Sequence, residues 1–226
     1  MTNADSGAAQ PALDTRRHFH EIASEFDDLY ESESRTSLRR WSDSMLRASV
    51  YRRFELVFEQ LGDLDGKSIL DMGCGGGRYA VTMGKLGARR VVGVDFARNM
   101  IELAVALRSK EGIGEDRVSF VCGDAAETDF DEPFDYGIAM GVLDYVEDAE
   151  GFLRVVLPKI TTRMVASFPV KWSIWTPQRK IRYRLFKNCP LYFYSRARLE
   201  SILGGLGLRS WKIHPAHRDF VAVMEP

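Results

Sequence analysis

The chain has few cysteines and lacks any long apolar stretch. Three of its 226 residues are cysteine, at positions 74, 122 and 189, and no two of them form a Cys-x-x-Cys pair. An odd number of scattered cysteines favours reduced thiols over a disulfide framework or a zinc site, so we expect a cytoplasmic protein without a metal site. No apolar run approaches the roughly 18 residues that a transmembrane helix needs, and we expect no association with a membrane.

Charge of either sign is not in excess. The sequence contains 31 Lys and Arg residues against 32 Asp and Glu residues, which gives a formal net charge of −1. This balance provides no overall positive field and argues against nucleic acid as the partner. Apolar residues, in contrast, make up 45% of the chain, and a chain of this length and hydrophobicity can bury the core of one globular domain.

The first 62 residues precede the main fold. Residues 1–14 are rich in Ala, Gly, Ser and Pro and lack the apolar core of a signal peptide, so we expect a disordered tail there. Residues 15–62 carry apolar side chains at helical spacing, the pattern of amphipathic helices. We expect these residues to form a helical lid in front of a domain that spans residues 63–226.

From residue 67 onward, short apolar runs alternate with helical patterns. The runs lie at Ser68–Met72, Arg90–Asp95, Val118–Cys122, Tyr136–Met140 and Met164–Phe168, and the helical patterns at Arg78–Leu86, Asn99–Lys110 and Asp148–Leu157. This order predicts a doubly wound α/β fold, in which helices cover both faces of a mostly parallel sheet. A further helix is expected at Arg196–Leu203, followed by strands near Leu208–His214 and Asp219–Met224. Only about five residues separate those two strands, too few for a crossover, so they should pair antiparallel.

A glycine-rich loop follows the first expected strand. Gly73, Gly75 and Gly77 come shortly after Asp71, and glycine permits positive φ and close approach of a ligand to the backbone. The dinucleotide-binding spacing G-x-G-x-x-G, begun at Gly73, would require glycine where Arg78 stands. Begun two residues later, it finds the tolerated alanine at position 80. The loop alone therefore leaves an NAD(P)-dependent oxidoreductase open.

Acidic residues at the strand ends weigh against that alternative. Asp71 suits a cation such as the methionyl ammonium of S-adenosylmethionine (SAM), whereas it would repel a pyrophosphate at the same helix N-terminus. Asp95 can accept hydrogen bonds from two ribose hydroxyls. Asp124 can accept one from an adenine amino group, beside the N–H of Ala125. Each of the latter two acids could instead cap the helix that follows it, but three acids at the carboxyl ends of successive parallel strands favour a ligand site.

Four stretches resemble the successive motifs of class I SAM-dependent methyltransferases. They are Asp71-Met-Gly-Cys-Gly-Gly-Gly, Gly93-Val-Asp95, Gly123-Asp124-Ala125 and the run from Phe134 to Tyr145, and the resemblance covers residues 67–168. It implies a seven-stranded, mostly parallel sheet that ends in an antiparallel hairpin. It also implies a SAM site, with S-adenosylhomocysteine (SAH) as the product, lined by Asp71, Gly73, Cys74, Gly75, Asp95, Phe96, Met100, Asp124, Ala125 and Met140, and by Tyr30 of the lid. A weaker resemblance links the stretch from Ala139 onward to porphyrin carboxyl methyltransferases.

The substrate side departs from the family pattern. Members of the family often have a histidine pair at the place that residues 141–145 occupy in this chain, and this chain lacks it. The candidate catalytic residues are therefore Asp144 and Tyr145 at that place, and His18 of the lid. The segment 169–194 is expected to form a cap. Its basic and aromatic side chains could bind an anionic or aromatic acceptor through Trp172, Arg179, Arg182 and Tyr183. The alternative is an amphipathic helix with a solvated basic face.

Together these features predict an enzyme that transfers a methyl group from SAM to an oxygen or nitrogen atom of a small molecule. Three other classes stay open, an NAD(P)-dependent oxidoreductase, a non-catalytic SAM-binding protein and a nucleic-acid methyltransferase, although the balanced charge gives the last little support.

Overall fold

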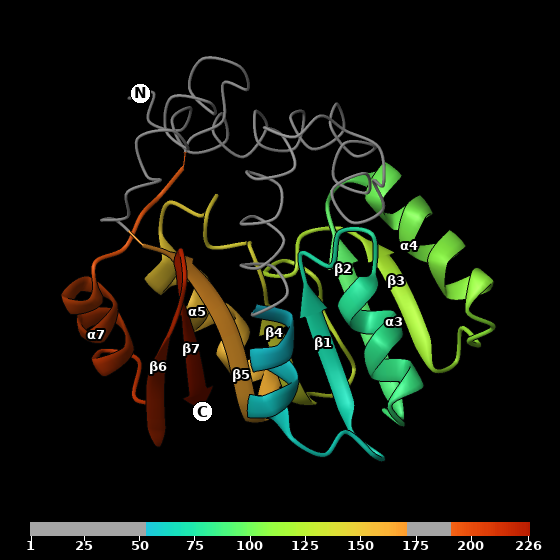
Figure 1. Ribbon diagram of the computed structural model, residues 1–226, viewed down its shortest axis with the longest axis horizontal. Coiled ribbons are helices and arrows are strands. Elements are labelled where there is room, and N and C mark those ends of the chain that lie inside the picture. Colours follow the sequence, from blue (N-terminus) through green and yellow to red (C-terminus); the bar gives the residue numbers. More distant parts are fainter. Residues whose placement is uncertain (1–52, 171–190) are drawn as a thin grey trace, which may run out of the picture.

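A seven-stranded sheet forms the centre of the structure, a computed structural model that describes residues 53–170 and 191–226 (Figure 1). The strand order is β3-β2-β1-β4-β5-β7-β6. The strands are β1 (Ser68–Met72), β2 (Arg90–Asp95), β3 (Val118–Cys122), β4 (Phe134–Ala139), β5 (Ile160–Pro169), β6 (Ser210–Ala216) and β7 (Asp219–Glu225). The first five are parallel, whereas β7 runs antiparallel to both of its neighbours, β5 and β6. The predicted doubly wound α/β fold with a C-terminal antiparallel hairpin is confirmed.

The sequence pattern located the strands closely. The expected bounds of β1, β2 and β3 are confirmed, whereas β4 and β5 begin before the expected residues. β5 begins earlier because Ile160 follows directly on a short 3₁₀ helix, η1 (Leu157–Lys159). The next two residues, Thr161 and Thr162, are exposed and polar, so they hide the start of this strand from a search for apolar runs.

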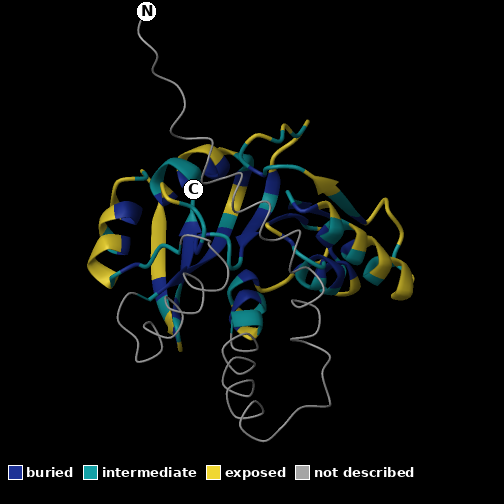
Figure 2. Ribbon diagram, turned by 90° about the horizontal axis from the view of Figure 1, so that it is seen from above, coloured by how far each residue is buried: buried dark blue, intermediate teal, exposed yellow. Residues whose placement is uncertain are grey.

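Helices cover both faces of the sheet. Along β1, Ile69 packs in the apolar cluster on one face and Leu70 in the cluster on the other. The first face is covered by α3 (Arg78–Lys85) and the helical residues 53–61, the second by α5 (Ala149–Val156) and α7 (Arg196–Gly204), and α4 (Arg98–Lys110) packs beside α3 and β3. Figure 2 shows the buried strands between helices whose outer sides are exposed. Because the central strands are buried on both faces, they appear in the sequence as continuous apolar runs.

Residues 53–61 end the segment that we expected to act as a lid, yet they belong to the core of the domain. Val57 is fully buried against the sheet. The rings of Phe54 and Phe58 lie 4.9 and 6.3 Å from the ring of Tyr79 in α3, measured between centroids. These contacts show that residues 53–61 pack as part of the α/β domain.

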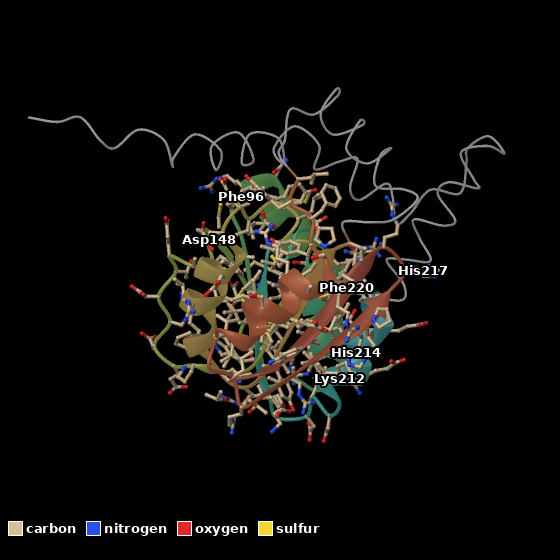
Figure 3. The ribbon with its side chains drawn as sticks, turned by 90° about the vertical axis from the view of Figure 1, so that its left-hand side faces the viewer. Phe96, Asp148, Lys212, His214, His217 and Phe220 are labelled. Carbon is tan, nitrogen blue, oxygen red and sulfur yellow. The ribbon has the colours of Figure 1, made fainter. Side chains whose placement is uncertain are left out.

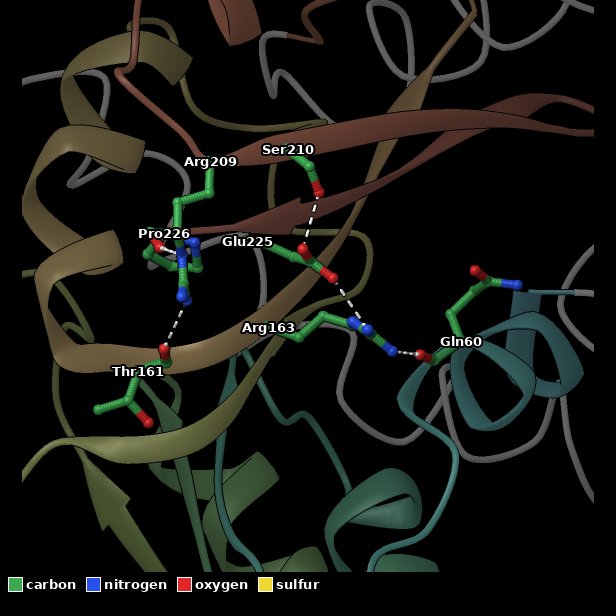
Figure 4. A network of polar contacts seen from close by, with 7 residues as sticks. All are labelled: Gln60, Thr161, Arg163, Arg209, Ser210, Glu225 and Pro226. Atoms are coloured by element: carbon green, nitrogen blue, oxygen red, sulfur yellow. Dashed lines mark hydrogen bonds and ion pairs between the residues drawn. The ribbon is translucent and has the colours of Figure 1, made fainter.

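The two ends of the sheet differ in character. At the amino ends of the parallel strands, Arg163 donates to the carbonyl of Gln60 at 2.6 Å and to Glu225 at 2.9 Å, and Ser210 donates to Glu225 at 2.8 Å (Figure 4). This network fastens β5, β6, β7 and residues 53–61 together. At the carboxyl ends, the strand order reverses between β1 and β4, and such a reversal is where open α/β sheets bind ligands.

Two kinds of feature are absent from the described ranges, 53–170 and 191–226. No helix there is long and apolar enough to cross a membrane. Nor does this part of the chain bring together His, Cys, Asp and Glu side chains that could hold a metal ion.

Candidate cofactor site

The glycine loop after β1 contains three glycines with positive φ, which are Gly73 at 67°, Gly75 at 51° and Gly77 at 78°. A Cβ on Gly77 would lie 2.8 Å from the Cβ of Ala104 in α4 and 2.8 Å from the ring of Phe120 in β3. No described atom lies within 4 Å of the corresponding position on Gly75. Gly77 is therefore required by packing, whereas Gly75 leaves room beside the backbone for a ligand.

Asp95 fixes the glycine loop to the end of β2. Its Oδ2 accepts a hydrogen bond from the N–H of Gly75 at 2.9 Å, and its Oδ1 accepts one from the N–H of Ala97 at 2.9 Å. The N–H of Gly73 donates to the carbonyl of Val94 at 2.8 Å. Asp95 is not the N-cap of α4, since that position is Ala97. A carboxylate can accept about four hydrogen bonds, so holding the loop is compatible with holding ribose hydroxyls as well.

Asp124 begins a tight turn after β3. Its Oδ1 accepts from the N–H of Ala126 at 2.9 Å, and its carbonyl accepts from the N–H and the hydroxyl of Thr128 at 2.8 and 2.6 Å. The N–H of Gly123 donates to the carbonyl of Asp95 at 3.0 Å, which joins the ends of β3 and β2. Asp124 thus caps its own turn, at the same end of the sheet as the glycine loop.

Asp71 lies at the base of the glycine loop and is almost fully buried, with 1% of its surface exposed. Within the described part of the chain, its Oδ2 has no hydrogen-bond partner. Burial, and then the nearby Asp95 carboxylate, raise the pKa of Asp71 to about 7, although the N–H of Ala80 lowers it. Burial and the same two carboxylates raise the pKa of the Cys74 thiol, which is therefore neutral. A buried carboxyl with one unpartnered oxygen fits a cationic ligand group.

The remaining predicted cofactor residues surround this end of the sheet. Phe96 is half-buried and packs with the buried Met100 at the start of α4. Met140 is half-buried just after β4. Figure 3 shows Phe96 at the upper end of the molecule, well above Lys212 and His214 of β6. Most of the cofactor residues that the sequence predicts thus lie near the carboxyl ends of β1, β2, β3 and β4, whereas β6 is the outermost strand at the opposite side of the sheet from β3.

The loop after β4 lies against the glycine loop. A Cβ on Gly73 would collide with the side chain of Val142. The N–H of Gly141 donates to the hydroxyl of Ser167 in β5 at 2.8 Å. Of the two candidate catalytic residues on this loop, Asp144 is buried, with 3% of its surface exposed, and Tyr145 is half-buried. Tyr145 is therefore the more accessible of the two.

Tyr194, which the sequence analysis did not identify, holds the loop after β4 from the other side. Its fully buried hydroxyl lies 3.3 Å from the carbonyl of Leu143 and 3.4 Å from that of Val146. Burial raises the pKa of Tyr194 to about 12, so its hydroxyl stays a donor. The N–H of Tyr192 also donates to the carbonyl of Asp144 at 2.9 Å. No local pattern could have revealed these contacts, because they join residues about 50 positions apart.

Removing the hydroxyl in Tyr194→Phe should loosen this loop. We expect a loss of about 1 kcal/mol in the free energy of unfolding, the usual contribution of one hydrogen bond. We also expect faster hydrogen exchange at the N–H of Tyr145, which donates to the carbonyl of Val142 at 3.0 Å. Urea denaturation and amide exchange measure the two effects, and the amides of β1 serve as the reference. An unchanged exchange rate at Tyr145 would contradict this role of Tyr194.

Several predicted residues lie outside the described ranges. They are the lid residues His18 and Tyr30 and the cap residues Trp172, Arg179, Arg182 and Tyr183.

Part of this chain is similar in sequence to known methyltransferases. Residues 69–158 match the family described as a methyltransferase domain. The mitochondrial ubiquinone biosynthesis O-methyltransferase of Schizosaccharomyces pombe is 34% identical over 104 residues, 46% of this chain and 38% of that protein. The protein of that name from Bradyrhizobium diazoefficiens is 34% identical over 109 residues, 48% of this chain and 42% of its own length. The match thus spans less than half the length of these curated relatives.

Solved structures share the fold over a larger part of the chain. Magnesium protoporphyrin IX methyltransferase from Synechocystis PCC 6803, crystallised with bound SAH, matches with a TM-score of 0.75 at 20% identity and covers 93% of this chain and 97% of its own. A SAM-dependent methyltransferase from Mesorhizobium loti matches with a TM-score of 0.62 at 17% identity and covers 77% of this chain and 98% of its own. At these identities the likeness establishes the fold.

Proposed function

We propose that the protein transfers a methyl group from SAM to a small molecule and releases SAH, because residues 69–158 match the methyltransferase-domain family and the chain shares the fold of a methyltransferase crystallised with SAH. One observation carries this proposal. The Oδ2 atom of the buried Asp71 carboxyl has no hydrogen-bond partner among the described residues, and Asp71 lies at the base of a glycine loop that is open beside Gly75.

Three acids divide the cofactor between them. Asp71 would hold the methionyl ammonium, Asp95 the ribose hydroxyls, and Asp124, with the N–H of Ala125, the adenine. The hydrogen bond from Gly75 to Asp95 and that from Gly123 to the carbonyl of Asp95 support this assignment, because they join the three strand ends into one surface. A nicotinamide dinucleotide fits this surface less well, since its pyrophosphate would lie beside Asp71.

The acceptor atom is proposed to be an oxygen, with nitrogen as the second possibility. Two relatives of similar sequence are named as O-methyltransferases of ubiquinone biosynthesis, which supports a hydroxyl group on a small molecule.

Positioning is the main task of the protein in this reaction. Bound SAM supplies a methyl group on a sulfonium, which already has a good leaving group. Holding the acceptor atom in line with the methyl group can supply about 7–11 kcal/mol, so the chain needs a well-shaped pocket more than a strong base. Tyr145 is the candidate acceptor contact on the loop after β4. The burial of Asp144 gives that residue a role in shaping the loop.

The cofactor assignment is tested by Asp95→Ala and Asp124→Ala. Losing a hydrogen bond to a charged group costs about 1.5–3 kcal/mol, so we expect the affinity for SAH to fall about ten- to a hundredfold in each variant. Isothermal titration calorimetry measures the affinity, and circular dichroism verifies the fold. Asp129→Ala, an exposed acid a few residues further along, should bind SAH like the parent. Unchanged affinity in both test variants, or binding of NADH in place of SAH, would overturn the proposal.

A further inference from the structure

The side chain of Lys159 is engaged by a single stretch of backbone. It is the last residue of η1, and its ammonium donates to the carbonyls of Ala125, Ala126 and Thr128 at 2.9, 3.1 and 2.7 Å. An ammonium has three N–H donors, so these three bonds use all of them. The ring of Phe130 completes the surroundings, with its centroid 5.5 Å from Nζ.

Lys159 forms these bonds with backbone carbonyls and not with a carboxylate. Among the described residues, no carboxylate forms an ion pair with Lys159, although the segment after Ala126 carries exposed acids at positions 127, 129 and 131. Lys159 is half-buried, and hydrogen bonds from a charged donor are about twice as strong as those between neutral groups. The lysine therefore fixes the position of the backbone and does not simply add to the surface charge.

The backbone that Lys159 holds is the turn that starts at Asp124. The amino end of this turn is fixed by Asp124, whose Oδ1 accepts from the N–H of Ala126. The carbonyl groups of the turn are held by Lys159, which lies 31 to 34 residues away along the chain. Ala125 is therefore held by Lys159 on its carbonyl side and followed by a residue whose N–H is held by Asp124. Its N–H is the expected adenine contact, and its own carbonyl bonds to Lys159.

We propose that Lys159 is a positioning residue for the adenine of the cofactor, acting through the turn at residues 124–128 without touching the ligand. This inference rests on the proposed function, because it takes Asp124 and the N–H of Ala125 as the adenine contacts. It adds a residue from the junction of α5 and β5 to a site whose direct contacts all come from other elements.

The test compares three variants by calorimetry with SAH and with adenosine, which carries the adenine and ribose but no methionyl group. Lys159→Met keeps the length of the side chain and removes every donor, and we expect it to weaken both ligands about tenfold, which corresponds to about 1.4 kcal/mol. Lys159→Arg keeps the charge and several donors in a different geometry, so its affinity should fall between those of the parent and Lys159→Met. Arg154→Met is the matched control. Arg154 donates to the carbonyl of Gly205 and to Glu150, away from the turn, and its loss should leave both affinities unchanged.

A merely structural role predicts a different result. It would lower the melting temperature of Lys159→Met but leave both affinities unchanged well below that temperature, and this outcome would overturn the proposal.

A double-mutant cycle gives a second readout. If Lys159 acts through the turn, the double variant Lys159→Met/Asp124→Ala should lose less binding free energy for SAH than the sum of the losses in the two single variants. A loss equal to that sum would contradict the proposal. Failure of the proposed function would look different again, because the parent protein itself would not bind SAH.

Discussion

Asp71→Asn is expected to stabilise the ligand-free protein at pH 8 and, at the same time, to weaken its binding of SAH. In the folded protein, burial and the nearby Asp95 carboxylate raise the pKa of Asp71 from 3.8 to about 7. A carboxyl whose pKa is raised by folding contributes stability below its ordinary pKa and loses it as the pH rises through the folded value. Here that loss takes place between about pH 4 and pH 7.

The expected size of this effect follows from the two pKa values. At about 1.4 kcal/mol per pH unit, the rise from 3.8 to about 7 corresponds to a cost on the order of 4 kcal/mol at pH 8. Asparagine has nearly the same shape but no charge, and an unsatisfied buried amide costs about 1–3 kcal/mol. The variant should therefore gain about 1–3 kcal/mol at pH 8, or a few degrees in melting temperature at about 2–4 °C per kcal/mol. At pH 5, where Asp71 is protonated in the parent, this gain should vanish.

Asp135→Asn is the matched control, because its pKa is displaced in the opposite direction. The N–H and the hydroxyl of Ser68 donate to Oδ2 of Asp135 at 2.8 and 2.9 Å. The backbone hydrogen bond contributes most to lowering its pKa. This stability is present above the ordinary pKa, so the variant should melt below the parent by the same amount at pH 5 and pH 8. The interpretation of Asp71 would be wrong if its difference from the parent did not grow with pH.

The raised pKa of Asp71 should also make the binding of SAH release a proton. An ammonium placed beside Asp71 lowers the pKa of its carboxyl, so SAH should release a proton when it binds at pH 7. Calorimetry in two buffers of different ionisation enthalpy measures that proton in the parent, and Asp71→Asn should release none from this group. Equal proton release by the parent and by Asp71→Asn would show that SAH does not bind beside the Asp71 carboxyl.

Gly75→Ala should lower mainly the affinity for SAH, whereas Gly77→Ala should lower mainly the stability of the fold. At Gly77 a new Cβ would lie 2.8 Å from both Ala104 and Phe120. Overpacking costs about 1–3 kcal/mol and a left-handed backbone for alanine about 1–2 kcal/mol more. Because total stability is typically about 5–15 kcal/mol, we expect Gly77→Ala to melt far below the parent. At Gly75 the space is open, so alanine should fold with only the backbone cost but lower the affinity for SAH at least about tenfold.

Gly112→Ala isolates the backbone cost in this comparison. Gly112 also has a positive φ, 67°, with no described atom within 4 Å of the added Cβ, and it lies in the exposed turn after α4. Thermal unfolding and SAH titration of all three variants should show equal small losses of stability at Gly75 and Gly112, and a loss of affinity only at Gly75. If Gly75→Ala bound SAH as tightly as Gly112→Ala, the open space beside Gly75 would not be part of the cofactor site.

The sequence predicted the strands that carry the proposed cofactor site better than the contacts that hold the loops after them, for physical reasons. The strands β1, β2 and β3 are short and mostly apolar, and each is followed by glycine or ends in an acidic residue, so their limits are visible in the sequence. Asp71 and Asp95 could be proposed as cofactor residues because Asp71 is the penultimate residue of β1 and Asp95 the last residue of β2. Tyr194 and Lys159 could not be identified, because each acts on a carbonyl group, and any residue can supply a carbonyl. The burial of Asp144 likewise depends on packing that no local pattern shows.

The position of β7 in the sheet has a consequence for how the chain is made. β7 follows β6 along the chain, yet it lies between β5 and β6 and is the only strand among the described residues that pairs with β6. As the chain leaves the ribosome, the strands from β1 to β5 can associate in turn, but β6 must wait without a partner until residues 219–225 have emerged. The sheet is therefore closed last by an inner strand, and a nascent chain that stops before residue 219 exposes the edge of β5 and both edges of β6.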